Sequence, residues 1–121
     1  MRTDLGFSKG RLIAQGAHAA IKIFTDRMDH TPDGLLISPR LYGVHWEAVQ
    51  YWLTKSFTKL VFRTDSRQGL LDICRRAEMI FLPHALMEET QGFVEPEPTA
   101  VALCPCEEDT YSPVIQGYRL L

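Results

Sequence analysis

The sequence predicts an α/β fold, in which helices cover both faces of a small mixed four-stranded sheet in a three-layer α/β/α sandwich. Stretches with helical spacing of apolar residues alternate with short apolar segments, and proline and glycine separate them. The chain has 121 residues, of which 45% are hydrophobic and 23% are charged. This size and composition are typical of one globular domain, so we treat residues 1–121 as a single domain.

The first helix is predicted to begin after Ser8 and to run from Lys9 to about Met28. The Ser8 hydroxyl can accept a hydrogen bond from an N–H group that the first turn leaves unpaired, and no proline interrupts the run. At about 100° per residue, one face carries Arg11, Gln15, His18 and Lys22, and the opposite face carries Ile13, Ala17, Ala20 and Phe24. We expect the apolar face to pack, and the polar face carries hydrogen-bond donors and a titratable imidazole that could serve a site. A merely solvated polar face is the alternative.

The next part of the chain predicts a loop, a helix and a strand. Residues 30–40 contain two prolines and a Pro-Asp-Gly turn, which favour a surface loop. A second helix is expected from about Val44 to Lys55, with Trp46, Val49 and Leu53 facing inward. Residues 56–63 then predict a strand.

A third helix is expected after Asp65 or Ser66, with an apolar stripe of Leu70, Ile73, Cys74 and Ala77. Two strands follow, at residues 82–87 and 99–103. A short final helix is predicted to begin at Asp109 or Ser112. Residues 118–121 are predicted to form an edge segment. Residues 1–5 would form the end of a first strand.

Composition excludes several classes of protein. No apolar run approaches the roughly 18 residues of a membrane span, and no charged-then-apolar leader is present, so we expect a cytoplasmic protein. Three cysteines, at Cys74, Cys104 and Cys106, fit reduced thiols, and the Cys-Pro-Cys spacing is too short to indicate a zinc site. Cys74 is expected to be a buried apolar residue.

Charge is distributed unevenly along the chain. Residues 1–84 carry 12 Lys or Arg against 8 Asp or Glu, whereas residues 85–121 carry 7 Asp or Glu against Arg119 alone. A net charge of -2 therefore leaves room for a basic face that binds RNA.

The N-terminal stretch resembles the signature of the type 2 peptidyl-tRNA hydrolases. The matching residues are Arg2, Asp4, Leu5, Ser8, Lys9, Gly10, Ala14, Gln15, His18 and Ala19. WLTKSFTKLVFR at residues 52–63 resembles bacterial and phage members, and TAVALCP at residues 99–105 resembles a further family motif.

This resemblance implies hydrolysis of the ester between a peptide and the terminal ribose of tRNA, without a metal or organic cofactor. It implies catalytic roles for Lys9, His18 and an acidic residue. The family's aspartate position falls on Glu89, with Glu88 as the alternative, and the loop that follows is shorter than in the family. Contacts to substrate are expected from Arg2, Asp4, Ser8, Arg11, Gln15, Lys22 and Thr90.

The implied partner is peptidyl-tRNA, with neither DNA nor a membrane, and family members are often homodimers. Replacement of aspartate by glutamate and the shorter loop leave a second reading, in which a protein of this fold binds tRNA without catalysis. A third reading is a protein-interaction module with no RNA partner.

Overall fold

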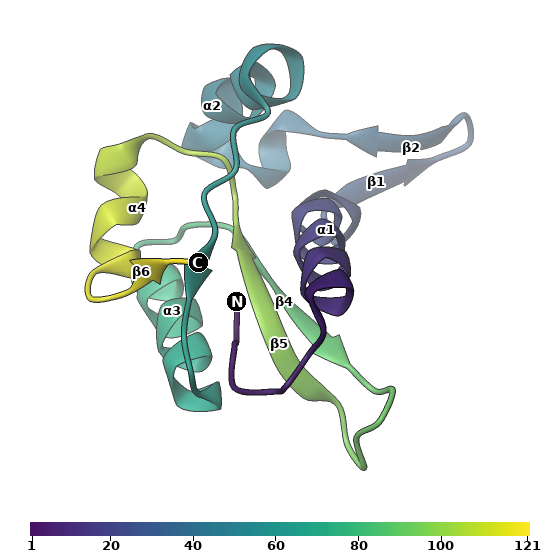
Figure 1. The fold of residues 1–121 in the computed structure, drawn as a ribbon. Helices are drawn as coiled ribbons and strands as arrows, with labels where there is room; N and C mark the ends of the chain where they lie inside the picture. Colours follow the sequence, from purple (N-terminus) through teal and green to yellow (C-terminus); the bar gives the residue numbers. More distant parts are fainter.

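A computed structural model describes all residues from Met1 to Leu121. In chain order the elements are α1 (Lys9–Thr25), β1 (Met28–Thr31), β2 (Gly34–Ile37), α2 (Trp46–Tyr51), β3 (Phe62–Arg63), α3 (Arg67–Met79), β4 (His84–Glu89), β5 (Glu97–Leu103), α4 (Glu108–Ile115) and β6 (Arg119–Leu120) (Figure 1). Short 3-10 turns precede α2, and a π-helical turn, Trp52–Ser56, follows it. No helix is both long and apolar enough to cross a bilayer.

The strands pair as three antiparallel two-stranded sheets, β1–β2, β3–β6 and β4–β5. The N-terminal segment lies between β5 and β3 (Figure 1), where the Arg2 N–H donates to the Thr99 carbonyl at 2.9 Å and Arg2 forms an isolated parallel bridge with Thr64. The mixed α/β class is confirmed. The four-stranded sheet and the three-layer sandwich are not, because the ladders stay separate and residues 1–5 contribute a single bridge rather than a strand.

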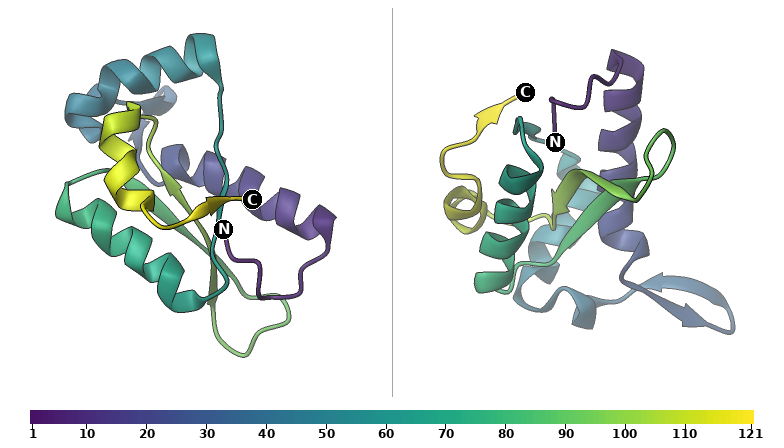
Figure 2. Two further views of the ribbon diagram at one scale, coloured as in Figure 1. Left: turned by 60° about the vertical axis from the view of Figure 1, so that its left-hand side comes forward. Right: turned by 90° about the horizontal axis from the view of Figure 1, so that it is seen from below.

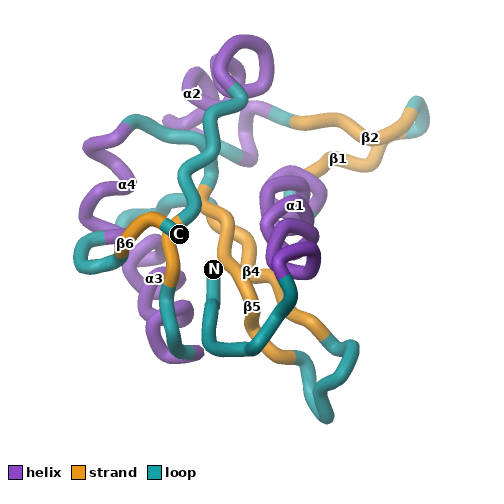
Figure 3. The backbone as a smooth tube through the Cα atoms, viewed as in Figure 1, coloured by secondary structure: helices purple, strands orange, loops and turns teal.

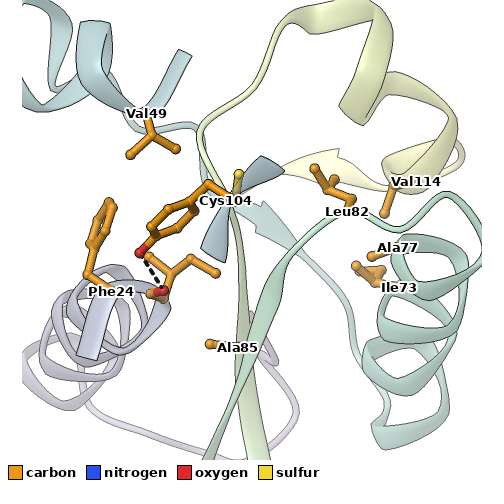
Figure 4. Close-up of a cluster of buried hydrophobic side chains, with 10 residues drawn as sticks. Phe24, Val49, Ile73, Ala77, Leu82, Ala85, Cys104 and Val114 are labelled. Atoms are coloured by element: carbon orange, nitrogen blue, oxygen red, sulfur yellow. Dashed lines mark hydrogen bonds between the residues drawn. The ribbon is translucent and has the colours of Figure 1, made fainter. Parts of the chain in front are cut away.

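Helix α1 lies on one side of the β4–β5 pair and α3 on the other, with α4 packed beside α3 (Figures 1 and 2). Ten buried residues form the core cluster: Ile23, Phe24, Tyr42, Val49, Ile73, Ala77, Leu82, Ala85, Cys104 and Val114 (Figure 4). The hydroxyl of buried Tyr42 donates to the Ile23 carbonyl at 3.4 Å, so the one phenol of this cluster keeps a partner.

The predicted helix caps and core stripes are largely confirmed. The Ser8 Oγ accepts from the Arg11 N–H at 3.3 Å, and the Ser66 Oγ accepts from the Gly69 N–H at 3.0 Å. All members of the predicted α3 stripe are buried, as is Val49 of α2. The final helix begins earlier than predicted, because the cap position falls on Glu107 rather than Asp109 or Ser112. Acidic side chains in its first turn suit the positive end of the helix dipole.

Two segments differ from their predictions. Residues 30–40 were expected to be a loop, but β1 and β2 form a hairpin that projects from the body of the protein (Figure 3). The turn signal marks its tip, where Gly34 has φ +133° and its carbonyl accepts from the Thr31 hydroxyl at 2.9 Å. The strand expected at residues 56–63 shortens to Phe62–Arg63, because its partner β6 offers only two residues for pairing.

The packing face of α1 was predicted wrongly. Ile13 is 73% exposed and Ala17 is also exposed, whereas Gln15, Ala19 and Ile23 are buried against β4 and β5. Phe24 packs as expected, on Tyr42 and Trp52. A polar side chain can occupy the packed face here because, as shown next, both ends of the Gln15 amide have partners.

Candidate active site

Helix α1 meets the end of β4 through Gln15, the polar residue of its packed face. The Gln15 Nε2 donates to Glu89 Oε2 at 2.9 Å, and the Gln15 Oε1 accepts from the Thr99 hydroxyl at 2.6 Å. Gln15 is only 3% exposed and Thr99 only 1%. These two bonds orient the amide, with its donor end toward Glu89, and connect α1 to both strands of the β4–β5 pair.

The Glu89 carboxylate is held by the backbone that follows it. Its Oε1 accepts from the N–H groups of Thr90 and Gln91, both at 3.0 Å. The Arg11 guanidinium lies 3.5 Å from Oε2 and donates to the Gln91 carbonyl at 2.7 Å. The Gln91 N–H is the largest cause that lowers the pKa of Glu89; partial burial opposes it, and Thr90 and Arg11 reinforce it. Glu89 is therefore a fixed negative charge at neutral pH. We call Arg11, Gln15, Glu89 and Thr99 the amide–carboxylate cluster.

Arg2 and Asp4 form an ion pair with each other. Arg2 is 6% exposed and donates to Asp4 Oδ2 at 2.6 Å, to the Pro98 carbonyl at 3.0 Å and to the Glu97 carboxylate. The hydrogen bond from Arg2 is the largest cause that lowers the pKa of Asp4. These contacts hold the N-terminal segment against β5, and they leave Arg2 little capacity to bind a phosphate.

The other expected site residues lie at the surface. Lys9 and His18 are exposed and make no side-chain hydrogen bond or ion pair, and none joins His18 to Glu89. Lys22 pairs with Asp26 at 2.8 Å, and the Ser8 hydroxyl serves as the cap of α1. Thr90 is exposed and contributes its backbone N–H to Glu89. Glu88 is exposed and is absent from the cluster, so the structure brings Glu89 rather than Glu88 to Gln15.

Sequence reasoning missed the role of Thr99 and an aromatic pair beside the cluster. Phe7, in the loop before α1, lies edge-on to Phe93, with ring centroids 6.3 Å apart. The Arg11 guanidinium lies 4.1 Å from the centre of the Phe7 ring. Thr99 matched a motif, but only the folded chain brings it to Gln15, which is 84 residues away. No spacing rule connects residues so far apart.

The cysteines do not contribute chemistry to this site. Burial raises the pKa of Cys104 to about 12 and that of Cys106 to about 11, so both stay protonated thiols at neutral pH. Cys74 is buried, as predicted. Nowhere in the chain do three or more His, Cys, Asp or Glu side chains gather in a way that suits a metal ion.

Thr99→Val is expected to lower the free energy of unfolding by about 1–3 kcal/mol and to reduce turnover. Valine keeps the shape of threonine but leaves the Gln15 Oε1 buried without a donor, and that is the cost of an unpaired buried polar group. Urea unfolding beside steady-state hydrolysis measures both effects. The matched control is Thr58→Val, at an exposed position outside the cluster. Equal stability of Thr99→Val and the unaltered protein would contradict the coupling.

The chain is similar over its whole length to one family of known proteins. A model of the family described as Peptidyl-tRNA hydrolase PTH2 matches residues 1–121. Proteins named peptidyl-tRNA hydrolase from Methanocaldococcus jannaschii and Methanococcus vannielii are each 31% identical to this chain over 124 residues, covering all of it and 95% and 94% of their own length. One from Saccharolobus solfataricus is 24% identical, covering all of this chain and 94% of its own. These relatives are archaeal, so the expected likeness to bacterial and phage members gains no support.

Proposed function

The chain belongs to the peptidyl-tRNA hydrolase PTH2 family, whose members hydrolyse the ester of peptidyl-tRNA, and we propose that the amide–carboxylate cluster is where this chain does so. The products are a peptide and free tRNA. One observation carries the proposal: the Glu89 carboxylate, 74 residues from Gln15 along the chain, is hydrogen-bonded to a buried amide on the helix that bears the family signature.

Glu89 is assigned to hold and orient the attacking water. Its Oε1 is filled by two backbone N–H groups, whereas Oε2 has one close hydrogen bond, from Gln15, and Arg11 only at 3.5 Å. A carboxylate oxygen accepts about two hydrogen bonds, so Oε2 keeps capacity for a water. A carboxylate with a lowered pKa is a weak base, which favours orientation of the water over full removal of its proton. His18, on the same helix, is the alternative base.

Lys9 is assigned to the negative charge that develops on the ester carbonyl, or to a phosphate beside it. It is the first residue of α1, where unpaired N–H groups and the helix dipole already favour an anion. Its ammonium is exposed and has no partner in the protein, so it is available to substrate. Arg11 remains a candidate for a phosphate, since its pair with Glu89 is long.

Phe7 and Phe93 are assigned to the terminal base of the tRNA. They stand beside Arg11 and Glu89, and both are partly exposed. Aromatic rings stack on any base without reading its identity, and every tRNA ends in the same reacting ribose. Contacts to backbone and bases of this sequence-tolerant kind suit an enzyme that accepts all tRNAs.

We further propose that the protein is a homodimer, that it is cytoplasmic and that its strands form a continuous sheet. Ile13 and Ile21 are 73% and 59% exposed on α1, which supports a homodimer interface on that helix. A function in translation supports a cytoplasmic location. Backbone hydrogen bonds that join residues 1–3 to Thr64 and Thr99 support a continuous sheet of the N-terminal segment, β3, β5 and β4 between helical layers, with β6 as an added edge segment.

The test is hydrolysis of labelled N-acetylaminoacyl-tRNA by the purified protein. We expect multiple-turnover release of the acyl group, with free aminoacyl-tRNA left largely intact. Release no faster than in buffer would contradict catalysis. In that case salt-dependent binding of tRNA would support the non-catalytic tRNA-binding reading, and the absence of such binding would support a protein-interaction module.

A further inference from the structure

A second polar surface lies away from the amide–carboxylate cluster, at the β3–β6 edge of the molecule. It is an open groove of about 270 Å³. The lining residues are Arg63, Thr64, Asp65, Gly117, Tyr118 and Arg119. Almost all of this lining is polar or charged, whereas pockets for small apolar ligands are lined mainly by hydrophobic side chains. A charged ligand therefore fits the groove better than an apolar one.

Two arginines lie side by side in the lining of this groove. Arg63 and Arg119 are direct partners in the β3–β6 register, and both are exposed. Like charges at directly opposed positions of an antiparallel pair are destabilising. Neither guanidinium takes part in any ion pair or side-chain hydrogen bond of the molecule, and the exposed Asp65 carboxylate pairs with neither of them. No ion pair of the protein therefore offsets this repulsion. Asp65 is the one acidic residue in the lining, so the two arginines leave the groove with a surplus of positive charge that a bound anion would offset.

We propose that the groove binds backbone phosphates of the tRNA on the stem side of the ester, an inference that rests on the proposed function. Backbone contacts connect the groove to the cluster. Thr64, beside Arg63, bridges Arg2, and the Arg2 N–H bonds the carbonyl of Thr99. Counted through the N-terminal segment and β5, Arg63 on β3 is three neighbouring strands away from β4 and Arg119 on β6 is four. At about 4.8 Å per step, a ligand held between them lies about 14–19 Å from β4. At that distance the ligand lies beyond the terminal nucleotide.

Phosphate is the tRNA group that this pair of side chains suits. A guanidinium forms two parallel hydrogen bonds with phosphate oxygens and stays charged at any physiological pH. Every tRNA offers phosphates in this region whatever its sequence, so such contacts position the substrate without selecting among tRNAs. The groove thereby adds affinity to a site whose own free cations are few, because Arg2 and Lys22 are already paired.

The test compares the unaltered protein with Arg63→Gln/Arg119→Gln on two substrates. For full-length N-acetylaminoacyl-tRNA we expect KM to rise about tenfold with kcat unchanged. The slope of log affinity against log salt, measured by anisotropy of labelled deacylated tRNA, should fall by about 1.4–1.8 for two lost phosphate contacts. For N-acetylaminoacyl-adenosine, which has the ester but no stem phosphates, kcat/KM should not change.

The matched control, Arg40→Gln/Arg75→Gln, removes the same charge from exposed arginines outside the groove and should leave KM and the salt slope nearly as they are. Arg63→Lys/Arg119→Lys should keep most of the salt slope. An unchanged KM and salt slope in the groove variant, or an equal loss on N-acetylaminoacyl-adenosine, would overturn the inference. Failure of the unaltered protein to hydrolyse either ester would count against the proposed function instead, and tRNA anisotropy would still test the groove.

Discussion

Glu89→Gln is expected to lower kcat for peptidyl-tRNA by about 100- to 1000-fold. The change removes the negative charge that orients water. It also replaces one acceptor oxygen with an NH2 donor. That donor would face other donors, because Gln15, Thr90 and Gln91 all donate to the Glu89 oxygens. KM should change little, since the carboxylate does not attract the polyanionic substrate. Steady-state hydrolysis with a parallel urea unfolding curve separates lost catalysis from lost folding.

Glu88→Gln is the matched control for this prediction, because Glu88 is the neighbouring residue on β4, is exposed and makes no contact with Gln15. It should retain full activity. If Glu88→Gln is inactive and Glu89→Gln is active, the catalytic carboxylate belongs to Glu88 and not to Glu89. Glu89→Asp adds a third measurement. The shorter arm of aspartate withdraws from Gln15, so we expect an intermediate loss, even though aspartate is the residue that the family resemblance associates with this position.

The parts of the fold that the sequence predicted are those set by local rules. Ser8 and Ser66 cap helices because a short side chain with an acceptor oxygen precedes a proline-free run. The stripe of Leu70, Ile73 and Ala77 is buried because it repeats with the helical period. The site motif on α1 was likewise visible as a pattern of residues. Its connection to Glu89 came from the resemblance rather than from any spacing.

The parts that the sequence did not predict depend on partners distant in the chain. Apolarity alone favoured Ile13 as the packed position of α1, whereas Gln15 is buried because Glu89 and Thr99 satisfy both ends of its amide. The β1–β2 hairpin was hidden by its prolines, which mark its turn and flank rather than a continuous loop. The pairing of Arg2 with Glu97 could not be predicted either, since the two residues are 95 positions apart in the chain.

Lys9→Ala and His18→Ala are each expected to lower turnover by about a hundredfold or more, with little effect on stability. Both side chains are exposed and form no hydrogen bond or ion pair in the protein, so their removal breaks no such interaction in the folded chain. The loss of turnover would therefore reflect lost interactions with the substrate alone. Lys9→Arg, which keeps the charge at the start of α1, should recover part of the activity.

Lys55→Ala and His30→Ala are the matched controls, because each removes an exposed side chain of the same type from an element outside the site. Both should keep near-normal turnover. The comparison also assigns the base. If His18→Ala loses kcat while KM holds, His18 acts on the reacting water. If only KM rises, His18 contacts the ribose or a phosphate, and the water is oriented by Glu89 without a histidine base. Full activity of both variants would place catalysis within the amide–carboxylate cluster alone, where Glu89 Oε2 keeps capacity for a water while Gln15 and Thr99 are buried.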